Sequence, residues 1–136
     1  MRRFAFMVLL VLVLSLVACG GESAPTGGEG GAGAADATDG ETLFAQQLIG
    51  TQAGCVTCHS LEPDVVVVGP SLAKIGAEAG SRVSGVSAEE YLRQSILEPD
   101  AYTVEGVPAG LMSKALADEL SEEQIGDLVA YMLTLR

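Results

Sequence analysis

The chain has 136 residues and a formal net charge of -11, from 18 acidic and 7 basic side chains. A chain this acidic repels nucleic acid and anionic lipid, because binding to both depends on Lys and Arg side chains close to phosphate. We therefore expect no nucleic-acid partner and a protein partner that presents a basic surface.

The first element is an apolar run from Phe4 to Ala18, preceded by Arg2 and Arg3. As a helix it would extend about 22 Å, which is less than the roughly 30 Å thickness of a hydrocarbon core. A positively charged start followed by a short apolar core is typical of a signal peptide, and we predict one over residues 1–18. An uncleaved membrane anchor is the alternative.

Leu16-Val17-Ala18-Cys19, at the end of this run, resembles the lipobox of bacterial lipoproteins. The resemblance implies that Cys19 is lipidated and becomes the first residue of the mature chain. A cysteine placed there by chance is the alternative. Either way, we expect the rest of the chain to be exported and tethered.

Residues 19–37 are predicted to hold the lipidated Cys19 and a flexible linker, because Gly is abundant there and bulky apolar side chains are nearly absent. The folded domain is then expected over residues 38–136. Capping signatures predict three of its helices, each with a hydroxyl at the N-cap and Glu or Gln three residues later: Thr38 with Glu41, Ser87 with Glu90, and Ser121 with Gln124.

The first of these helices should end near Gly50, and the second should end before Pro99. Gly69 and Pro70 should open another short helix. The run 64–68 is the only segment that resembles a strand, and a single strand has no partner. The sequence therefore predicts an all-α domain with four or so short helices and long loops.

Two thiols and the only imidazole of the chain lie together in the segment "CVTCH", Cys55 to His59. Cys-x-x-Cys-His is typical of c-type haem attachment. Two thiols on one turn can form thioethers with the two vinyl groups of a porphyrin, and the following imidazole can ligate the iron. We expect one covalent haem c, bound by Cys55 and Cys58 with His59 as the metal ligand. The domain's scarce aromatic residues leave room for it in the core.

The same segment allows two other interpretations. A thioredoxin-like dithiol would use the same two cysteines, but it expects a βαβ context that the sequence lacks. A structural zinc site needs four nitrogen or sulfur ligands. No Cys or His follows His59, so such a site would be incomplete.

The second axial ligand must come from another residue type, because His59 is the only histidine. Methionine is the other strong-field ligand common in cytochromes. Two of the four methionines lie in the predicted signal peptide, and Met132 lies on the apolar stripe of the last helix. Met112, in an irregular Gly/Pro-containing loop, is therefore the predicted ligand. An open sixth site or ligation by Lys114 remains as an alternative.

Over about residues 38–136 the chain resembles the class I cytochrome c family. The resemblance rests on CVTCH, on "GPSL" at 69–72, on the segments "YLRQSILEP" and "DLVAYMLTL", and on the Gly40/Phe44 pair. It implies the class I fold around one covalent haem, with Tyr131 packed against Gly40 and Phe44. In one respect the chain departs from the family pattern, since Ser113 follows Met112 where relatives usually have proline.

The resemblance also implies two supporting roles. The carbonyl of Pro70 should accept the Nδ1–H of His59 and orient its ring. Arg82, in "GSRVSG", should pair with a haem propionate, unless it is simply a solvated loop arginine.

The function implied is electron transfer by a lipid-anchored monohaem carrier that shuttles electrons between membrane respiratory or photosynthetic complexes. Such a protein is no enzyme by itself, although it can be a subunit of an oxidoreductase complex. We expect it on the outer face of the cytoplasmic membrane or in the periplasm, held by the lipid on Cys19, with a basic patch on a membrane oxidase or reductase as partner. The alternatives are a haem sensor or peroxidase-like protein with an open iron, and a non-haem dithiol oxidoreductase.

Overall fold

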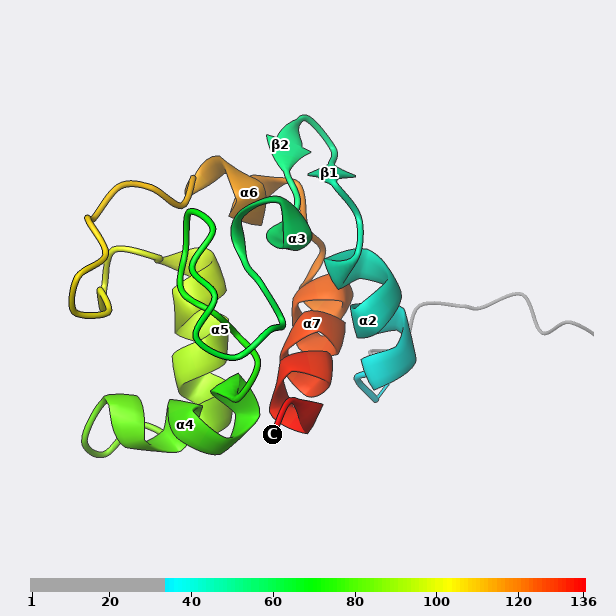
Figure 1. Ribbon diagram of the computed structural model, residues 1–136. Coiled ribbons are helices and arrows are strands. Elements are labelled where there is room, and N and C mark those ends of the chain that lie inside the picture. The colour runs from blue at the N-terminus through cyan, green and yellow to red at the C-terminus, as the bar shows by residue number, and fades with distance from the viewer. Residues whose placement is uncertain (1–33) are drawn as a thin grey trace, which may run out of the picture. The chain divides into compact units, whose positions relative to one another are not determined.

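The computed structural model describes residues 34–136, and the predicted signal peptide, Cys19 and most of the predicted linker lie outside that range. The described part is mostly helical (Figure 1). Its elements, with the labels of Figure 1, are α2 (Ala37–Phe44), β1 (Leu48–Ile49), β2 (Gln52–Ala53), α3 (Cys55–Cys58), α4 (Ile75–Arg82), α5 (Ala88–Leu97), α6 (Ala115–Asp118) and α7 (Glu122–Thr134). Within residues 34–136, no helix combines the length and apolar character needed to cross a membrane.

Helices α2 and α7 lie side by side and form the most extensive contact between two helices in the domain (Figure 1). Gly40 makes this close approach possible, because a Cβ there would lie 2.0 Å from the carbonyl oxygen of Asp127. Next to it the rings of Phe44 and Tyr131 pack with their centroids 5.4 Å apart. The predicted packing of Tyr131 against Gly40 and Phe44 is confirmed.

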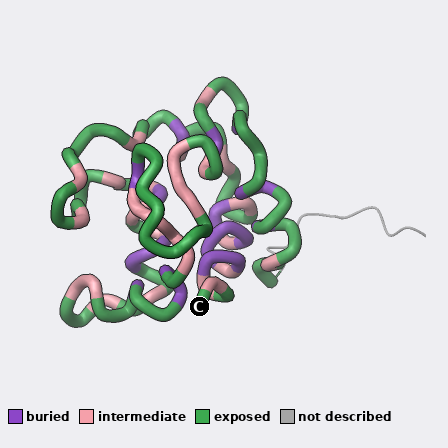
Figure 2. Tube along the Cα trace, in the orientation of Figure 1, coloured by how far each residue is buried: buried purple, intermediate pink, exposed green. Residues whose placement is uncertain are grey.

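The hydrophobic core lies between α7, α2, α4 and α5, and the buried segments concentrate on α7 (Figure 2). Its most deeply buried side chains are Phe44, Ala79, Leu92, Ile125 and Leu128. Burial of such side chains is the dominant favourable contribution to folding. The core therefore fixes the positions of these helices relative to one another.

Helices α5 and α7 begin as predicted, each with a complete capping box. The hydroxyls of Ser87 and Ser121 accept backbone N–H groups three residues later, and the side chains of Glu90 and Gln124 accept the N-cap N–H groups in return. Helix α5 ends at Leu97, before the proline.

The prediction for the first helix is wrong at both ends. Its N-cap is Asp36, whose carboxylate accepts the N–H of Thr38 at 2.7 Å, so Thr38 lies inside the helix and caps nothing. The helix ends at Phe44 rather than near Gly50. Gly50 instead has a φ of 56° and forms the turn between β1 and β2, a short antiparallel pair that the sequence did not predict.

The helix predicted to open at Pro70 is also wrong, because α4 begins only at Ile75. Residues 69–72 are committed to other partners. The N–H groups of Gly69 and Leu72 donate to the carbonyls of Cys58 and Ser60 at 2.9 and 2.8 Å. These contacts hold the segment in an irregular conformation beside α3. The run 64–68 forms no strand.

Replacing Gly40 by Ala tests the α2–α7 contact. The added methyl group must push the two helices apart, and overpacking of this kind costs about 1–3 kcal/mol of unfolding free energy. Gly126→Ala on α7 is the matched control, because its Cβ would meet only the Cβ of Ala35, at 3.5 Å. Helix propensity there favours Ala by about 1 kcal/mol. Denaturant unfolding of the two variants should shift in opposite directions, and equal shifts would contradict the packing described.

Candidate functional site

A single turn of helix carries the three chemically distinctive side chains of the domain. Helix α3 spans Cys55–Cys58, and the N–H of His59 at its C-cap donates to the carbonyl of Cys55 at 2.9 Å. Cys55, Cys58 and His59 all line one cavity of about 260 Å³. The structure therefore brings the three residues predicted from the sequence to the wall of one chamber.

The rest of the cavity wall is mostly apolar and comes from segments far apart in the sequence. It includes side chains of α2, α5 and α7 as well as the loops 68–72 and 99–113. Its larger apolar members are Phe44, Val68, Leu72, Ile75, Leu92, Ile96, Val104, Val107, Leu111, Leu116 and Leu128, together with Met112 and Met132. A cavity with apolar walls and a few placed polar groups is typical of a cofactor site.

The imidazole of His59 is oriented by the backbone. Its Nδ1 lies 2.9 Å from the carbonyl oxygen of Pro70. Because a carbonyl oxygen can only accept, Nδ1 carries the proton in this contact, and the lone pair is left on Nε2. This is the contact that the resemblance implies for Pro70. The ring also packs on Gly69, where a Cβ would lie 2.5 Å from its Cε1 atom.

Burial raises the pKa of the Cys55 thiol to about 11. This thiol is therefore neutral near pH 7, whereas a dithiol redox site depends on a thiolate stabilised by its surroundings. Both Cys55 and Cys58 are free thiols in the structure. Among residues 34–136, no three His, Cys, Asp or Glu side chains gather where they could hold a metal ion. A buried, neutral thiol does not fit a dithiol redox site, whereas two thiols and a histidine on one helical turn fit the covalent attachment of a cofactor.

Two methionine side chains reach the cavity. Met132 is buried within α7 and belongs to the hydrophobic core. Met112 is half-buried and follows a loop whose ends are tied by a hydrogen bond, from the N–H of Gly110 to the carboxylate of Asp100 at 2.7 Å. Lys114, the other alternative, is exposed and is not among the residues lining the cavity.

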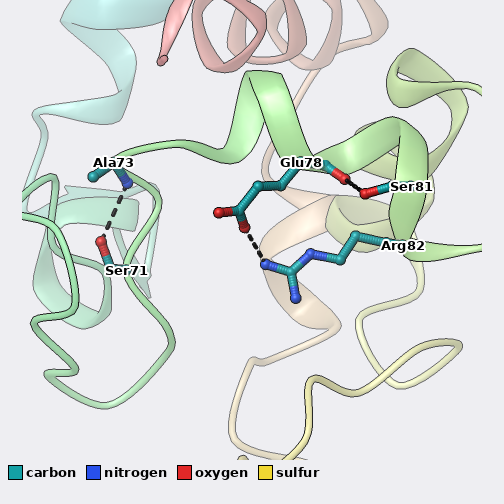
Figure 3. A network of polar contacts seen from close by, with 5 residues as sticks. All are labelled: Ser71, Ala73, Glu78, Ser81 and Arg82. Carbon is teal, nitrogen blue, oxygen red and sulfur yellow. Dashed lines mark hydrogen bonds and ion pairs between the residues drawn. The ribbon is translucent and has the colours of Figure 1, made fainter.

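Arg82 lies in a different setting from the one predicted. It is the last residue of α4 rather than a loop residue, and its guanidinium forms an ion pair with Glu78 at 2.6 Å (Figure 3). Arg82 also lines the cavity. The ion pair joins residues four apart on one helix, at a partly solvent-exposed position where such a pair contributes little to stability.

Several features of the site have no clear signal in the sequence. The rings of Tyr91 and Tyr102 meet edge to face in the cavity wall, with centroids 5.6 Å apart. Tyr91 lies on α5 and Tyr102 in the loop after it, so no helical or strand spacing predicts that the two rings meet. Likewise, the carbonyl of Cys58 accepts two consecutive N–H groups, from Val68 at 3.1 Å and Gly69 at 2.9 Å. Only the folded loop brings these groups together.

The fold and the site together define a small helical protein with an attachment turn, an oriented histidine and an apolar cavity. The model of the cytochrome c family matches residues 37–136, and the chain belongs to that family. Neither the curated proteins nor the solved structures contained a match. Members of the family are electron-transfer haem proteins that bind haem c covalently and are generally electron carriers rather than enzymes.

The described residues fit haem c. Cys55 and Cys58 are free thiols on one turn, the Nε2 atom of His59 keeps its lone pair, and all three side chains line the same apolar cavity. These residues would supply the two attachment points and one axial ligand.

Gly69→Ala tests the support of His59. The methyl group would collide with the imidazole, so the ring must tilt away from the carbonyl of Pro70 or the loop must shift. A histidine that loses its Nδ1–H contact is a weaker donor to iron, so the midpoint potential should rise. Gly80→Ala is the control, because its Cβ would meet nothing closer than the Cβ of Ala88 at 3.6 Å. Potentiometric titration should separate the two variants, and identical potentials would contradict the role of Gly69.

Proposed function

We propose that this protein is a lipid-anchored, monohaem electron carrier of class I type with His59 and Met112 as axial ligands. It carries single electrons between membrane respiratory or photosynthetic complexes. The observation that supports this most is the convergence of Cys55, Cys58 and the oriented His59 on one apolar cavity. When bound, haem c supplies a one-electron ferric/ferrous couple.

The chain's own residues do three things for this function. Cys55 and Cys58 hold the group covalently, so that it is not lost to a dilute external compartment. The Pro70 carbonyl fixes the proton on Nδ1 of His59 and so keeps Nε2 free as a ligand. The apolar wall excludes water, and a low dielectric disfavours additional charge. A carrier of this kind needs no catalytic acid, base or nucleophile.

The assignment of Met112 rests on its place in the fold. Met132 is 7% exposed and packs in the core of α7, and this packing accounts for it fully. Met112 lies on a loop at the cavity wall and is only partly buried, at the edge of the core, and its thioether sulfur is the ligand we propose. A methionine ligand raises the reduction potential, which suits a carrier that delivers electrons to an oxidase.

One observation favours a second candidate function, a sensor or peroxidase-like protein with an open sixth site. Ser113 follows Met112 in the loop, and Gly106 and Gly110 within the loop have φ values of 83° and 79°. Glycines in this conformation leave the backbone with little resistance to rearrangement. The sixth position would then admit small ligands whenever the loop moved.

Met112→Ala separates the two candidates. If Met112 is the ligand, the ferric protein should lose its weak sulfur-to-iron charge-transfer band, its potential should fall, and it should bind added imidazole. In a protein with an open site, the wild type would already lack the band and the variant would match it. Absorption spectra of the ferric and ferrous forms of the wild type and the variant distinguish the two candidate functions.

Met132→Ala is the matched control for that variant. Truncating a buried methionine should cost roughly 2–5 kcal/mol of unfolding free energy. The spectrum should keep its charge-transfer band. If Met132→Ala loses the band and Met112→Ala loses only stability, the axial assignment is reversed.

The location is proposed from the N-terminal sequence. The apolar run before Leu16-Val17-Ala18-Cys19 supports export and lipidation at Cys19, and residues 20–35, which precede the N-cap of α2, would serve as a tether. About 16 residues of such a chain have a root-mean-square reach of about 22 Å. The proposed site is the outer face of the cytoplasmic membrane or the periplasm. The proposed partner is a membrane oxidase or reductase with a basic patch, which fits the net charge of -11.

Cys19→Ala tests the anchor. Stable membrane attachment requires about two acyl chains, which a lipidated N-terminal cysteine supplies and an alanine does not. The variant should be released from washed membranes or should accumulate as the longer precursor, while Ser23→Ala in the proposed tether should change neither. A wild-type protein that is fully soluble without detergent would contradict the anchor.

A further inference from the structure

The loop that follows the attachment motif exposes a run of apolar side chains. We define the valine loop as residues 61–67, which read Leu-Glu-Pro-Asp-Val-Val-Val. Val66 and Val67 are 65% and 55% exposed, and Val65 and Leu61 are 40% exposed each. The whole segment is exposed in Figure 2. Three consecutive exposed valines are a concentration of apolar surface of the kind that marks interaction sites on soluble proteins.

The loop is held in place by hydrogen bonds at its base. The hydroxyl of Ser71 donates to the carbonyl of Glu62 at 2.7 Å, and the N–H of Glu62 donates to the hydroxyl of Ser60 at 2.8 Å. Asp64 has a φ of 63°, a left-handed conformation that Asp tolerates better than most residues. The exposure of the valines thus belongs to a defined turn.

The same loop is tied to the attachment site. Val68, directly after it, donates its N–H to the carbonyl of Cys58 and lines the cavity. Val65, Val66 and Val67 are not among the cavity-lining residues. A group bound in the cavity therefore leaves these three side chains uncovered, although they directly precede Val68 in the cavity wall.

We propose that the valine loop is the docking surface for the electron-transfer partner, and that this partner presents an apolar patch with basic residues around it. The proposal rests on the proposed function. Charge decides between the occupants, because the loop carries Glu62 and Asp64 and no basic residue. A second copy would bring these carboxylates against their equivalents, and an anionic lipid surface would repel them. A partner with a basic rim gains from both the carboxylates and the valines.

The test uses haem-loaded protein, reduced beforehand, and membranes of the source organism, with the oxidation rate measured at several salt concentrations. Val66→Ser/Val67→Ser should raise the KM for oxidation about tenfold at every salt concentration and leave kcat unchanged, because it removes apolar contact that salt does not screen. Glu62→Gln/Asp64→Asn should instead flatten the salt dependence and leave the rate at high salt unchanged. Leu48→Ser is the control, since Leu48 is also 65% exposed but lies on β1.

Spectra and midpoint potentials of all variants should equal those of the wild type, which separates docking from damage to the site. A KM for Val66→Ser/Val67→Ser equal to that of the wild type would overturn the docking surface and leave the proposed function intact. The docking surface would also be overturned if the wild type, but not Val66→Ser/Val67→Ser, formed a dimer in sedimentation or bound vesicles of neutral phospholipid. A wild-type protein that has the expected spectrum but is not oxidised by the membranes would overturn both proposals.

Discussion

The carbonyl oxygen of Cys58 is the junction on which the site depends. It accepts the N–H groups of Val68 and Gly69, and so it fixes the following loop against the attachment turn. With Gly69 in place, the His59 ring packs on its backbone and reaches the carbonyl of Pro70. One set of backbone contacts thereby positions the two thiols, the His59 imidazole and the valine loop together. A small domain gains from this, because each additional independent contact would have to offset its own loss of conformational entropy.

The helices supply what that network cannot, which is a rigid frame around the cavity. The close approach of α2 and α7 at Gly40 and the capping boxes of α5 and α7 fix the helix positions. The core between them is mostly aliphatic, with the rings of Phe44 and Tyr131 packed at one side of it and tilted by 55° to each other. Residues 34–136 contain only four aromatic side chains, and three of them, Phe44, Tyr91 and Tyr102, also line the cavity. Most of the aromatic side chains in the described domain therefore face the space that haem c would fill.

The sequence predicted best where a local rule determines the structure. Both capping boxes and the end of α5 before Pro99 follow from short-range signals, and the structure confirms them. The packing of Tyr131 against Gly40 and Phe44, which the structure also confirms, was predicted from the family resemblance and from no local rule. Prediction from the sequence failed where two local rules competed. Asp36 and Thr38 are both good N-caps, and the N–H of Asp36 also donates to the carboxylate of Asp127, a contact 91 residues away that no local pattern contains. Pro70 suits a helix start, but its carbonyl is used by His59 instead. Most residues of the cavity wall come from segments that only such distant contacts bring together. The sequence therefore predicted the residues on the attachment turn but not most of those opposite them.

We propose that the chain holds haem c through Cys55 and Cys58 and that its domain depends on this group. Protein produced in a host that matures c-type cytochromes tests this most directly, by its mass after denaturation and by the thermal unfolding of the native form. We expect the wild type to retain the mass of one haem after denaturation. We expect Cys55→Ala/Cys58→Ala to retain none and to show no cooperative unfolding transition. A wild type that loses all haem on denaturation, or a haem-free double variant that unfolds as cooperatively as the wild type, would contradict it.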